Sequence, residues 1–186
     1  MKWSTVTGAA LLLLSSTASG TRLRLASWNI HYGNPKLDAD RSGGPPGEMY
    51  WEWRFEVADL KGRFRDMIAG SLERLSTVVG LQEVLKHQLD DLMGVANEKG
   101  GSDWAYAGVG RDDGKEKGEY CPIIYYKKAH KALRCTTIWL SKTPTKAGSK
   151  SWGAAYPRIA TMCAFENVET KGRFVMANTH MDHVSA

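Results

Sequence analysis

Three apolar segments of the sequence each lead into a side chain that can bind a metal ion. These side chains are Asn29, Glu83 and His180. The residues before each of them predict short β-strands, and ligands collect at strand ends in sheets flanked by helices. A carboxylate at such a place is costly to bury unless it is paired or binds a metal. The amide oxygen of Asn29 and the carboxylate of Glu83 together suit Mg²⁺, which prefers oxygen ligands and keeps several waters.

Each of the three side chains also has an ordinary structural interpretation. Glu83 can cap the turn or helix that follows it, and Asn29 can form a hydrogen bond that ends its strand. His180 can be a core histidine whose hydrogen bonds are satisfied by its neighbours. The residue types alone leave both interpretations open.

The order of these segments resembles that of the endonuclease/exonuclease/phosphatase family, the DNase I-like hydrolases. The segments similar to its first three motifs are Ser27-Trp28-Asn29-Ile30, Leu81-Gln82-Glu83-Val84 and Asn178-Thr179-His180-Met181-Asp182-His183. Further segments that resemble the family are Arg111-Asp112-Asp113-Gly114, Gly118-Glu119-Tyr120 and Trp139-Leu140-Ser141. The resemblance covers roughly residues 23–185 and is strongest to secreted members.

The resemblance implies roles for five residues. Asn29 and Glu83 would hold the metal, Mg²⁺ with Mn²⁺ as a possible substitute. His180 would act at the phosphate, as a hydrogen-bond donor or an acid, and Glu119 would be the carboxylate that orients it. A carboxylate beside an imidazole fixes its tautomer. Arg111 is a further candidate for phosphate contact.

The activity implied is metal-dependent hydrolysis of a phosphodiester or a phosphomonoester, as in nucleases and phosphatases. Nucleic acid, a sugar phosphate and a phospholipid headgroup are all compatible substrates, and no protein partner is predicted. The alternative is a secreted, non-catalytic protein that binds phosphate-bearing ligands. A Ser/His/Asp hydrolase is disfavoured because no Gly-x-Ser-x-Gly turn occurs, and the sequence has no P-loop or dinucleotide fingerprint.

The sequence departs from the family pattern at its end. It stops at Ala186, shortly after the third motif, and holds neither a Gly-Asp-x-Asn segment nor a terminal Asp-His pair. We therefore expect a C-terminally truncated domain with impaired activity, in which the strand before His180 lacks partners. The family pattern gives Asp182 no ligand role.

The N-terminus reads as a secretory signal peptide. Lys2 is followed by an apolar run over residues 6–14 and by small residues up to Gly20. The run is shorter than the ~18 apolar residues that a membrane span needs. The sequence predicts a signal peptide over 1–20, a partial catalytic domain over 21–186 and an extracellular protein.

Charge and cysteine content add weaker constraints. The formal net charge of +5 permits an anionic substrate without requiring one. Secretion allows a disulfide, but three cysteines, Cys121, Cys135 and Cys163, leave at least one thiol free, and their spacing does not identify a pair.

Hydrophobic periodicity predicts one α/β domain with a mixed or antiparallel sheet and helices outside it. The resemblance implies the DNase I-like form of an α/β (α+β) domain, a layered sandwich of β-sheets flanked by helices, with its second half incomplete. The predicted helices are Phe55–Leu75 and Lys86–Ala96, and a basic turn is expected over 127–131. The predicted strands are Leu23–Asn29, Thr77–Leu81, Trp104–Val109, Cys121–Tyr126, Thr136–Leu140, Arg158–Glu166 and Phe174–Asn178.

Overall fold

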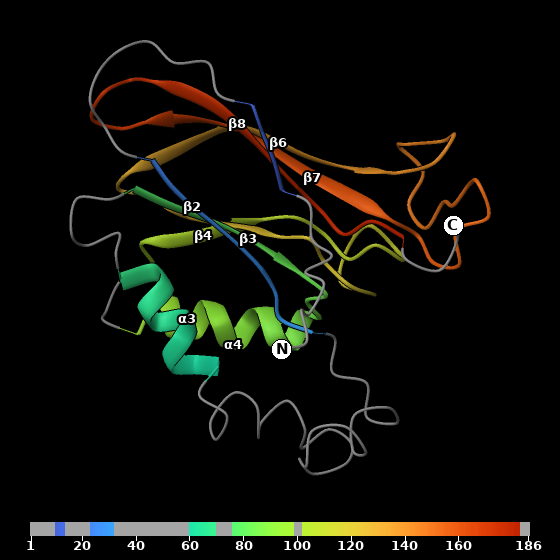
Figure 1. Cartoon of the computed structure of the whole chain (residues 1–186), viewed down its shortest axis with the longest axis horizontal. Coiled ribbons are helices and arrows are strands. Elements are labelled where there is room, and N and C mark those ends of the chain that lie inside the picture. The colour runs from blue at the N-terminus through green and yellow to red at the C-terminus, as the bar shows by residue number, and fades with distance from the viewer. Residues whose placement is uncertain (1–9, 14–22, 32–59, 70–75, 99–101, 183–186) are drawn as a thin grey trace, which may run out of the picture.

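The computed structural model describes residues 10–13, 23–31, 60–69, 76–98 and 102–182 (Figure 1). Within these ranges the chain forms strands and two helices, whose bounds follow in chain order. They are β1 Ala10–Leu13, β2 Leu23–Asn29, α3 Leu60–Ala69, β3 Ser76–Gln82, α4 Lys86–Ala96, β4 Trp104–Ala107, β5 Ile123–Tyr126, β6 His130–Trp139, β7 Ile159–Asn167 and β8 Arg173–Thr179.

The strands form two four-stranded sheets that face each other. One sheet has the order β2-β3-β5-β4 and the other the order β1-β8-β7-β6. Strands β2 and β3 run parallel, with Asn29 opposite Gln82, whereas the other neighbouring strands are antiparallel. Because parallel neighbours end at the same edge of a sheet, the polar residues that follow β2 and β3 lie together.

The layers follow from the alternation of side chains along β3. Val79 and Leu81 point to one face, where they pack in a core with residues of α3 and α4. Val78 points to the other face, where it packs between the sheets with Phe165 and Met176. Successive side chains of a strand point to opposite faces. Because β3 has apolar side chains on both faces, its sheet lies between the helices and the second sheet.

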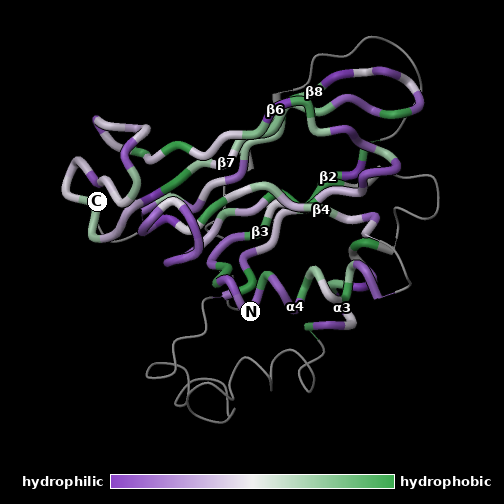
Figure 2. The backbone as a smooth tube through the Cα atoms, turned by 180° about the vertical axis from the view of Figure 1, so that it is seen from behind, coloured by the Kyte–Doolittle hydropathy of each residue, from purple (hydrophilic) through white to green (hydrophobic). Residues whose placement is uncertain are grey.

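The two helices cover the outer face of the sheet that contains β3 (Figure 1). Helix α4 buries Leu89, Leu92 and Val95 at three-residue spacing, on one face of the helix. Figure 2 shows hydrophobic and hydrophilic segments alternating along it. Its bounds agree with the prediction. The ends of the longer helix predicted over Phe55–Leu75 lie outside the described residues. Neither described helix is long and apolar enough to cross a membrane.

The predicted start of strand β6 was wrong. The basic turn expected over 127–131 is formed by residues 127–129. The strand expected over Thr136–Leu140 is β6, which begins at His130 and pairs along β7. Much of β6 is exposed at the edge of its sheet, so its sequence lacks the apolar pattern of a buried strand. An irregularity in the pairing between Ala132 and Arg134 weakens the pattern further.

Strand β8 was expected to lack partners, and this expectation was also wrong. It lies between β7 and β1, with Ala160 opposite Thr179 and Leu12 opposite Met176. Strand β1 belongs to the segment predicted as a signal peptide. Removal of that peptide would therefore leave β8 at the edge of its sheet.

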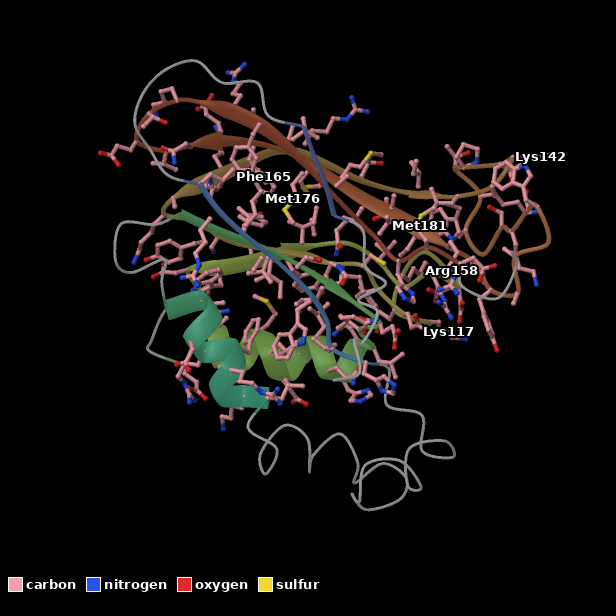
Figure 3. The ribbon with its side chains drawn as sticks, viewed as in Figure 1. Lys117, Lys142, Arg158, Phe165, Met176 and Met181 are labelled. Carbon is pink, nitrogen blue, oxygen red and sulfur yellow. A yellow bond between two sulfur atoms is a disulfide. The ribbon has the colours of Figure 1, made fainter. Side chains whose placement is uncertain are left out.

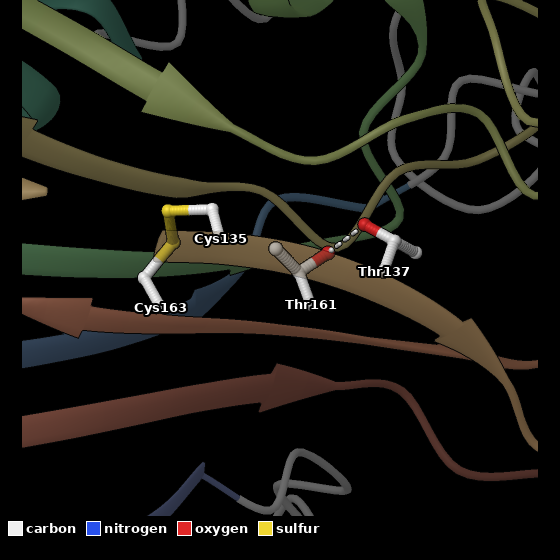
Figure 4. The surroundings of a disulfide bond; sticks show 4 residues. All are labelled: Cys135, Thr137, Thr161 and Cys163. Carbon is white, nitrogen blue, oxygen red and sulfur yellow. Dashed lines mark hydrogen bonds between the residues drawn. A yellow bond between two sulfur atoms is a disulfide. The ribbon is translucent and has the colours of Figure 1, made fainter. Parts of the chain in front are cut away.

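One disulfide joins the neighbouring strands β6 and β7. It links Cys135 to Cys163, whose Cα atoms are 4.1 Å apart, and the hydroxyl groups of Thr137 and Thr161 share a hydrogen bond beside it (Figure 4). Cys121 is a free, buried thiol. Burial raises its pKa to about 12, so this thiol is unreactive near neutral pH.

Candidate functional site

Asn29 and Glu83 lie together although 54 residues separate them in sequence. The amide Nδ2 of Asn29 donates a 2.7 Å hydrogen bond to Oε1 of Glu83. The amide oxygen of Asn29 in turn accepts a 2.9 Å hydrogen bond from the backbone N–H of His31. The parallel pairing of β2 with β3 brings the two side chains to one sheet edge, as the sequence predicted.

Glu83 has an unusual backbone conformation. Its φ is 60°, and that of His31 is 67°, both in the left-handed region that side chains other than glycine adopt rarely. The turn at Glu83 ends β3 and lets Val84 pair with Tyr120, through hydrogen bonds of 2.7 and 3.4 Å. Strained backbone of this kind is concentrated at functional sites, which favours a functional role for Glu83 over that of a simple cap.

His180 completes the cluster from the second sheet. It follows β8 directly and is buried, with Nε2 3.5 Å from Oε1 of Glu83. Its other ring nitrogen, Nδ1, lies 2.9 Å from a terminal nitrogen of Arg158. The second terminal nitrogen of Arg158 donates a 2.9 Å hydrogen bond to Asp182. Arg158 was not among the site residues predicted from the sequence, because no local pattern marks it.

Glu119 lies near the site but pairs with Arg111 and not with His180, the partner that was expected. Its carboxylate accepts a 2.8 Å hydrogen bond from Arg111, whereas Arg158 contacts Nδ1 of His180. Burial raises the pKa of Glu119, the guanidinium of Arg111 opposes this rise, and the nearby carboxylate of Glu83 adds to it. The two carboxylates of Glu119 and Glu83 are therefore close enough to repel each other, although Arg111 donates to Glu119 and Asn29 donates to Glu83.

Arg111 is fixed on several sides. Its backbone carbonyl accepts a 2.6 Å hydrogen bond from the indole N–H of Trp139. Its guanidinium lies over the ring of Tyr156, 5.2 Å from the ring centre, and the side chain is only 11% exposed. Tyr156 itself is half exposed. The structure thus holds Arg111 rigidly beside Glu119, as suits a residue that presents a positive charge to an anion.

A buried amide of β8 connects the two sheets behind the cluster. Asn178 donates to the backbone carbonyls of Leu81 and Pro122, at 2.7 and 2.8 Å. Its oxygen accepts a 2.6 Å hydrogen bond from Gln82. A side chain at Gly80 would meet this amide, because a Cβ built there lies 2.9 Å from Cγ of Asn178. Gly80 thus leaves room for the amide of Asn178, and Gln82, the last residue of β3, donates a hydrogen bond to it.

The site residues fit a hard divalent cation. Glu83 offers a carboxylate, and the amide oxygen of Asn29 can accept a second interaction beyond the one from His31, since a carbonyl has two lone pairs. Among the described residues, no group of three or more His, Cys, Asp or Glu side chains forms a metal-binding cluster. This donor set suits Mg²⁺ more than a metal enclosed by protein ligands, because Mg²⁺ commonly binds through one or two carboxylates and water.

Comparison with known proteins gives a clear result at the level of structure. No family model matches the sequence, and no curated protein matches it significantly. A solved endonuclease/exonuclease/phosphatase from Bacteroides vulgatus is 35% identical over 87% of this chain, with a TM-score of 0.69. The chain belongs to the endonuclease/exonuclease/phosphatase family. Its two facing sheets with outer helices are the DNase I-like fold expected for that family.

Two further solved structures support this assignment. A family member from Bacteroides thetaiotaomicron is 29% identical over 96% of the chain, with a TM-score of 0.68. A mannosyl-6-phosphatase from the same organism is 31% identical over 88% of the chain, also with a TM-score of 0.68. The chain spans about half the length of these structures, 53% of the first and the third and 52% of the second.

Proposed function

We propose that this protein hydrolyses phosphoesters with the help of a divalent cation, Mg²⁺ or Mn²⁺. The observation that carries the proposal is the contact of Asn29 and His180 with the same carboxylate oxygen of Glu83. An oxygen pair suited to a hard cation thus lies beside an imidazole that can contact phosphate. Family relatives that include a mannosyl-6-phosphatase support this chemistry, and they do not favour a protein that only binds phosphate.

In this proposal, Glu83 and Asn29 hold the cation and His180 contacts the phosphoryl oxygens. A bound divalent cation would polarise the phosphoryl group and make a bound water more acidic. Arg111, paired with Glu119, is a candidate for a second contact with the phosphate. A phosphomonoester of a sugar is the substrate class to test first, because one relative is named for such an activity. Nucleic acid is the second class.

The first test measures metal binding, which does not depend on turnover. Calorimetric titration with Mn²⁺ and with Mg²⁺ compares wild type with Glu83→Gln and Asn29→Ala. Glu83→Gln removes the formal charge and should weaken binding about tenfold or more, beyond the effect of Asn29→Ala. Glu166→Gln is a matched control, because Glu166 is similarly exposed, 18% against 19% for Glu83, and pairs with Arg173 at the other end of the sandwich.

Equal affinity of wild type and Glu83→Gln for both cations would contradict the proposed metal site. A second test assays mannose 6-phosphate, bis-nitrophenyl phosphate and plasmid DNA with Mg²⁺, with Mn²⁺ and with a chelator. Hydrolysis that depends on the cation and is lost in both Glu83→Gln and His180→Ala would support the proposal. Hydrolysis that persists in the chelator, or in both variants, would count against it.

We further propose that the protein is secreted, because the N-terminus resembles a signal peptide and the chain forms a disulfide. Disulfides persist in oxidising compartments and are rare in the cytosol. N-terminal sequencing of protein recovered from culture medium should begin near Thr21. Recovery of chains that retain Met1 from the cytosol alone would contradict secretion.

A further inference from the structure

Arg158 makes two directed contacts with residues that follow β8. One terminal nitrogen lies 2.9 Å from Nδ1 of His180 and the other donates to Asp182 at 2.9 Å. Arg158 precedes β7 and is 5% exposed, at the end of the sandwich away from Phe165 (Figure 3). Its two terminal nitrogens are therefore used in a fixed, forked geometry that a guanidinium can provide and an ammonium cannot.

The contact with His180 determines which ring nitrogen carries the proton. A guanidinium has N–H donors and no acceptor, so Nδ1 must accept the hydrogen bond from Arg158. An imidazole whose Nδ1 accepts is neutral, with its single proton on Nε2. This nitrogen lies 3.5 Å from Oε1 of Glu83. The ring therefore presents an N–H group to the candidate metal site.

A carboxylate at the same place would have the opposite effect. If Glu119 faced Nδ1, as the family resemblance implied, Nδ1 would carry the proton and Nε2 of the neutral ring would be an acceptor. The structure instead pairs Glu119 with Arg111 at 2.8 Å. Because a guanidinium and not a carboxylate contacts Nδ1, Nε2 of His180 is a hydrogen-bond donor and not a potential base.

Asp182 holds the guanidinium of Arg158 in place beside Nδ1 of His180. It lies two residues after His180, and alternate residues of an extended chain point to the same side. Its side chain is 13% exposed, and it bonds to the terminal nitrogen of Arg158 that does not contact His180. Charge-assisted hydrogen bonds of this kind are stronger than neutral ones, so Asp182 limits the freedom of Arg158 to turn away from the ring.

We propose that Arg158 is a positioning residue for His180. Held by Asp182, it keeps the imidazole proton on Nε2, so that His180 donates a hydrogen bond to a phosphoryl oxygen of the substrate. This inference rests on the proposed function for the role of the N–H group, but the tautomer of His180 can be measured without substrate.

The decisive experiment is nitrogen NMR of protein labelled with ¹⁵N-histidine, with the signals of His180 assigned from their loss in His180→Gln. In wild type, Nε2 should be protonated and Nδ1 unprotonated. Arg158→Met should produce a mixture of the two tautomers of His180. Asp182→Asn should produce a smaller change in the same direction. Arg158→Lys, which keeps a donor and the charge, should retain more of the wild-type pattern than Arg158→Met does.

Arg173→Met is the matched control, because Arg173 pairs with Glu166 at the opposite end of the same two strands and is 71% exposed. It should leave the signals of His180 unchanged. A wild-type ring protonated on Nδ1 would overturn the inference even if no variant folds, as would a tautomer that Arg158→Met does not alter.

Binding of inorganic phosphate to the Mn²⁺-loaded protein separates this inference from the proposed function. Arg158→Met should weaken the binding of phosphate about tenfold, comparable to the loss of one hydrogen bond to a charged group. Arg158→Lys should recover part of this affinity. If the tautomer behaves as expected but wild type binds neither Mn²⁺ nor phosphate, the proposed function fails and the placement of the proton by Arg158 stands. Phosphate binding that is unaffected by Arg158→Met would overturn the role given to the N–H group.

Discussion

Gln82 of β3 donates a 2.6 Å hydrogen bond to Asn178 of β8, across the interior between the two sheets. Gln82 immediately precedes Glu83, and Asn178 lies two residues before His180. Together with the hydrogen bonds of Asn178 to Leu81 and Pro122, this contact holds the strand end that carries the candidate metal ligand next to the strand end that carries the imidazole. The site depends on how the sheets are held together as much as on its own side chains.

Substitution of Asn178 should destabilise the fold. Asn178→Ala removes three hydrogen bonds and leaves Gln82 and two backbone carbonyls without this partner. Because each buried polar group left unsatisfied costs roughly 1–3 kcal/mol, we expect a loss of about 3 kcal/mol in the free energy of unfolding. Urea denaturation of wild type, both single alanine variants and the Gln82→Ala/Asn178→Ala double variant would measure it.

The double-variant cycle gives the coupling between the two amides directly. Residues in one hydrogen-bond network usually couple by about 0.5–3 kcal/mol. Effects of Gln82→Ala and Asn178→Ala that simply add would show that the contact across the sandwich does not stabilise the fold.

The proximity of Asn29 and Glu83 could be predicted from sequence, whereas the surroundings of His180 could not. Asn29 ends a strand predicted from alternating residues, and Glu83 follows an apolar one. Parallel strands that pair as neighbours end together. Arg158 reaches His180 only because β7 and β8 are antiparallel neighbours, a relationship between residues 22 apart that no local pattern reveals. Pairing between strands, rather than residue type, decided which charge lies beside the imidazole.

The edge strand β6 illustrates a second limit of sequence analysis. A buried strand such as β3 shows its pattern because both of its faces need apolar side chains. Strand β6 is held by pairing with β7 and by the Cys135–Cys163 disulfide, and half of its side chains are exposed. Since these constraints come from its neighbour, the first residues of β6, His130 and Lys131, resemble a continuation of the basic turn in sequence.

The Cys135–Cys163 disulfide should contribute substantially to stability. It closes a loop with a sequence separation of 28 residues, and loops of about this length are stabilised by roughly 2–4 kcal/mol when cross-linked. Denaturation of the Cys135→Ala/Cys163→Ala variant should show a loss of this size. Cys121→Ala is the control: a reducing agent should destabilise this variant as much as it destabilises wild type. An unfolding transition of wild type that does not respond to reduction would contradict this prediction.

His130 should make the protein less stable at acidic pH. It is buried among Phe165 and Phe174 at the end of the sandwich away from the site, and neither ring nitrogen has a hydrogen-bond partner among the described residues. Burial lowers the pKa of His130 from 6.5 to about 4. Between these values the unfolded chain binds a proton that the folded chain does not, so stability falls as pH decreases from about 6.5 to about 4.

The size of this effect follows from the shift in pKa. A shift of this extent corresponds to about 3 kcal/mol between pH 7 and pH 4. His130→Phe, which keeps an aromatic ring in the same surroundings, should remove this contribution, so that the difference in stability between variant and wild type grows as pH decreases. Urea denaturation at pH 4, 5, 6 and 7 would measure it, and a difference that stays constant over this range would contradict the assignment.

The last prediction distinguishes the two roles that His180 can have at the phosphate. A general acid gives its proton to the leaving group, so its removal harms poor leaving groups much more than good ones. With Nδ1 accepting from Arg158, His180 is neutral and carries its only ring proton on Nε2. It can donate a hydrogen bond without transferring that proton. His180→Ala should therefore lower kcat/KM by a similar factor, about 10²–10³, for a nitrophenyl phosphate and for an alkyl phosphate. Because the test compares ratios of rates, a low absolute activity does not affect it. A loss at least tenfold greater for the alkyl ester would show that His180 acts as an acid.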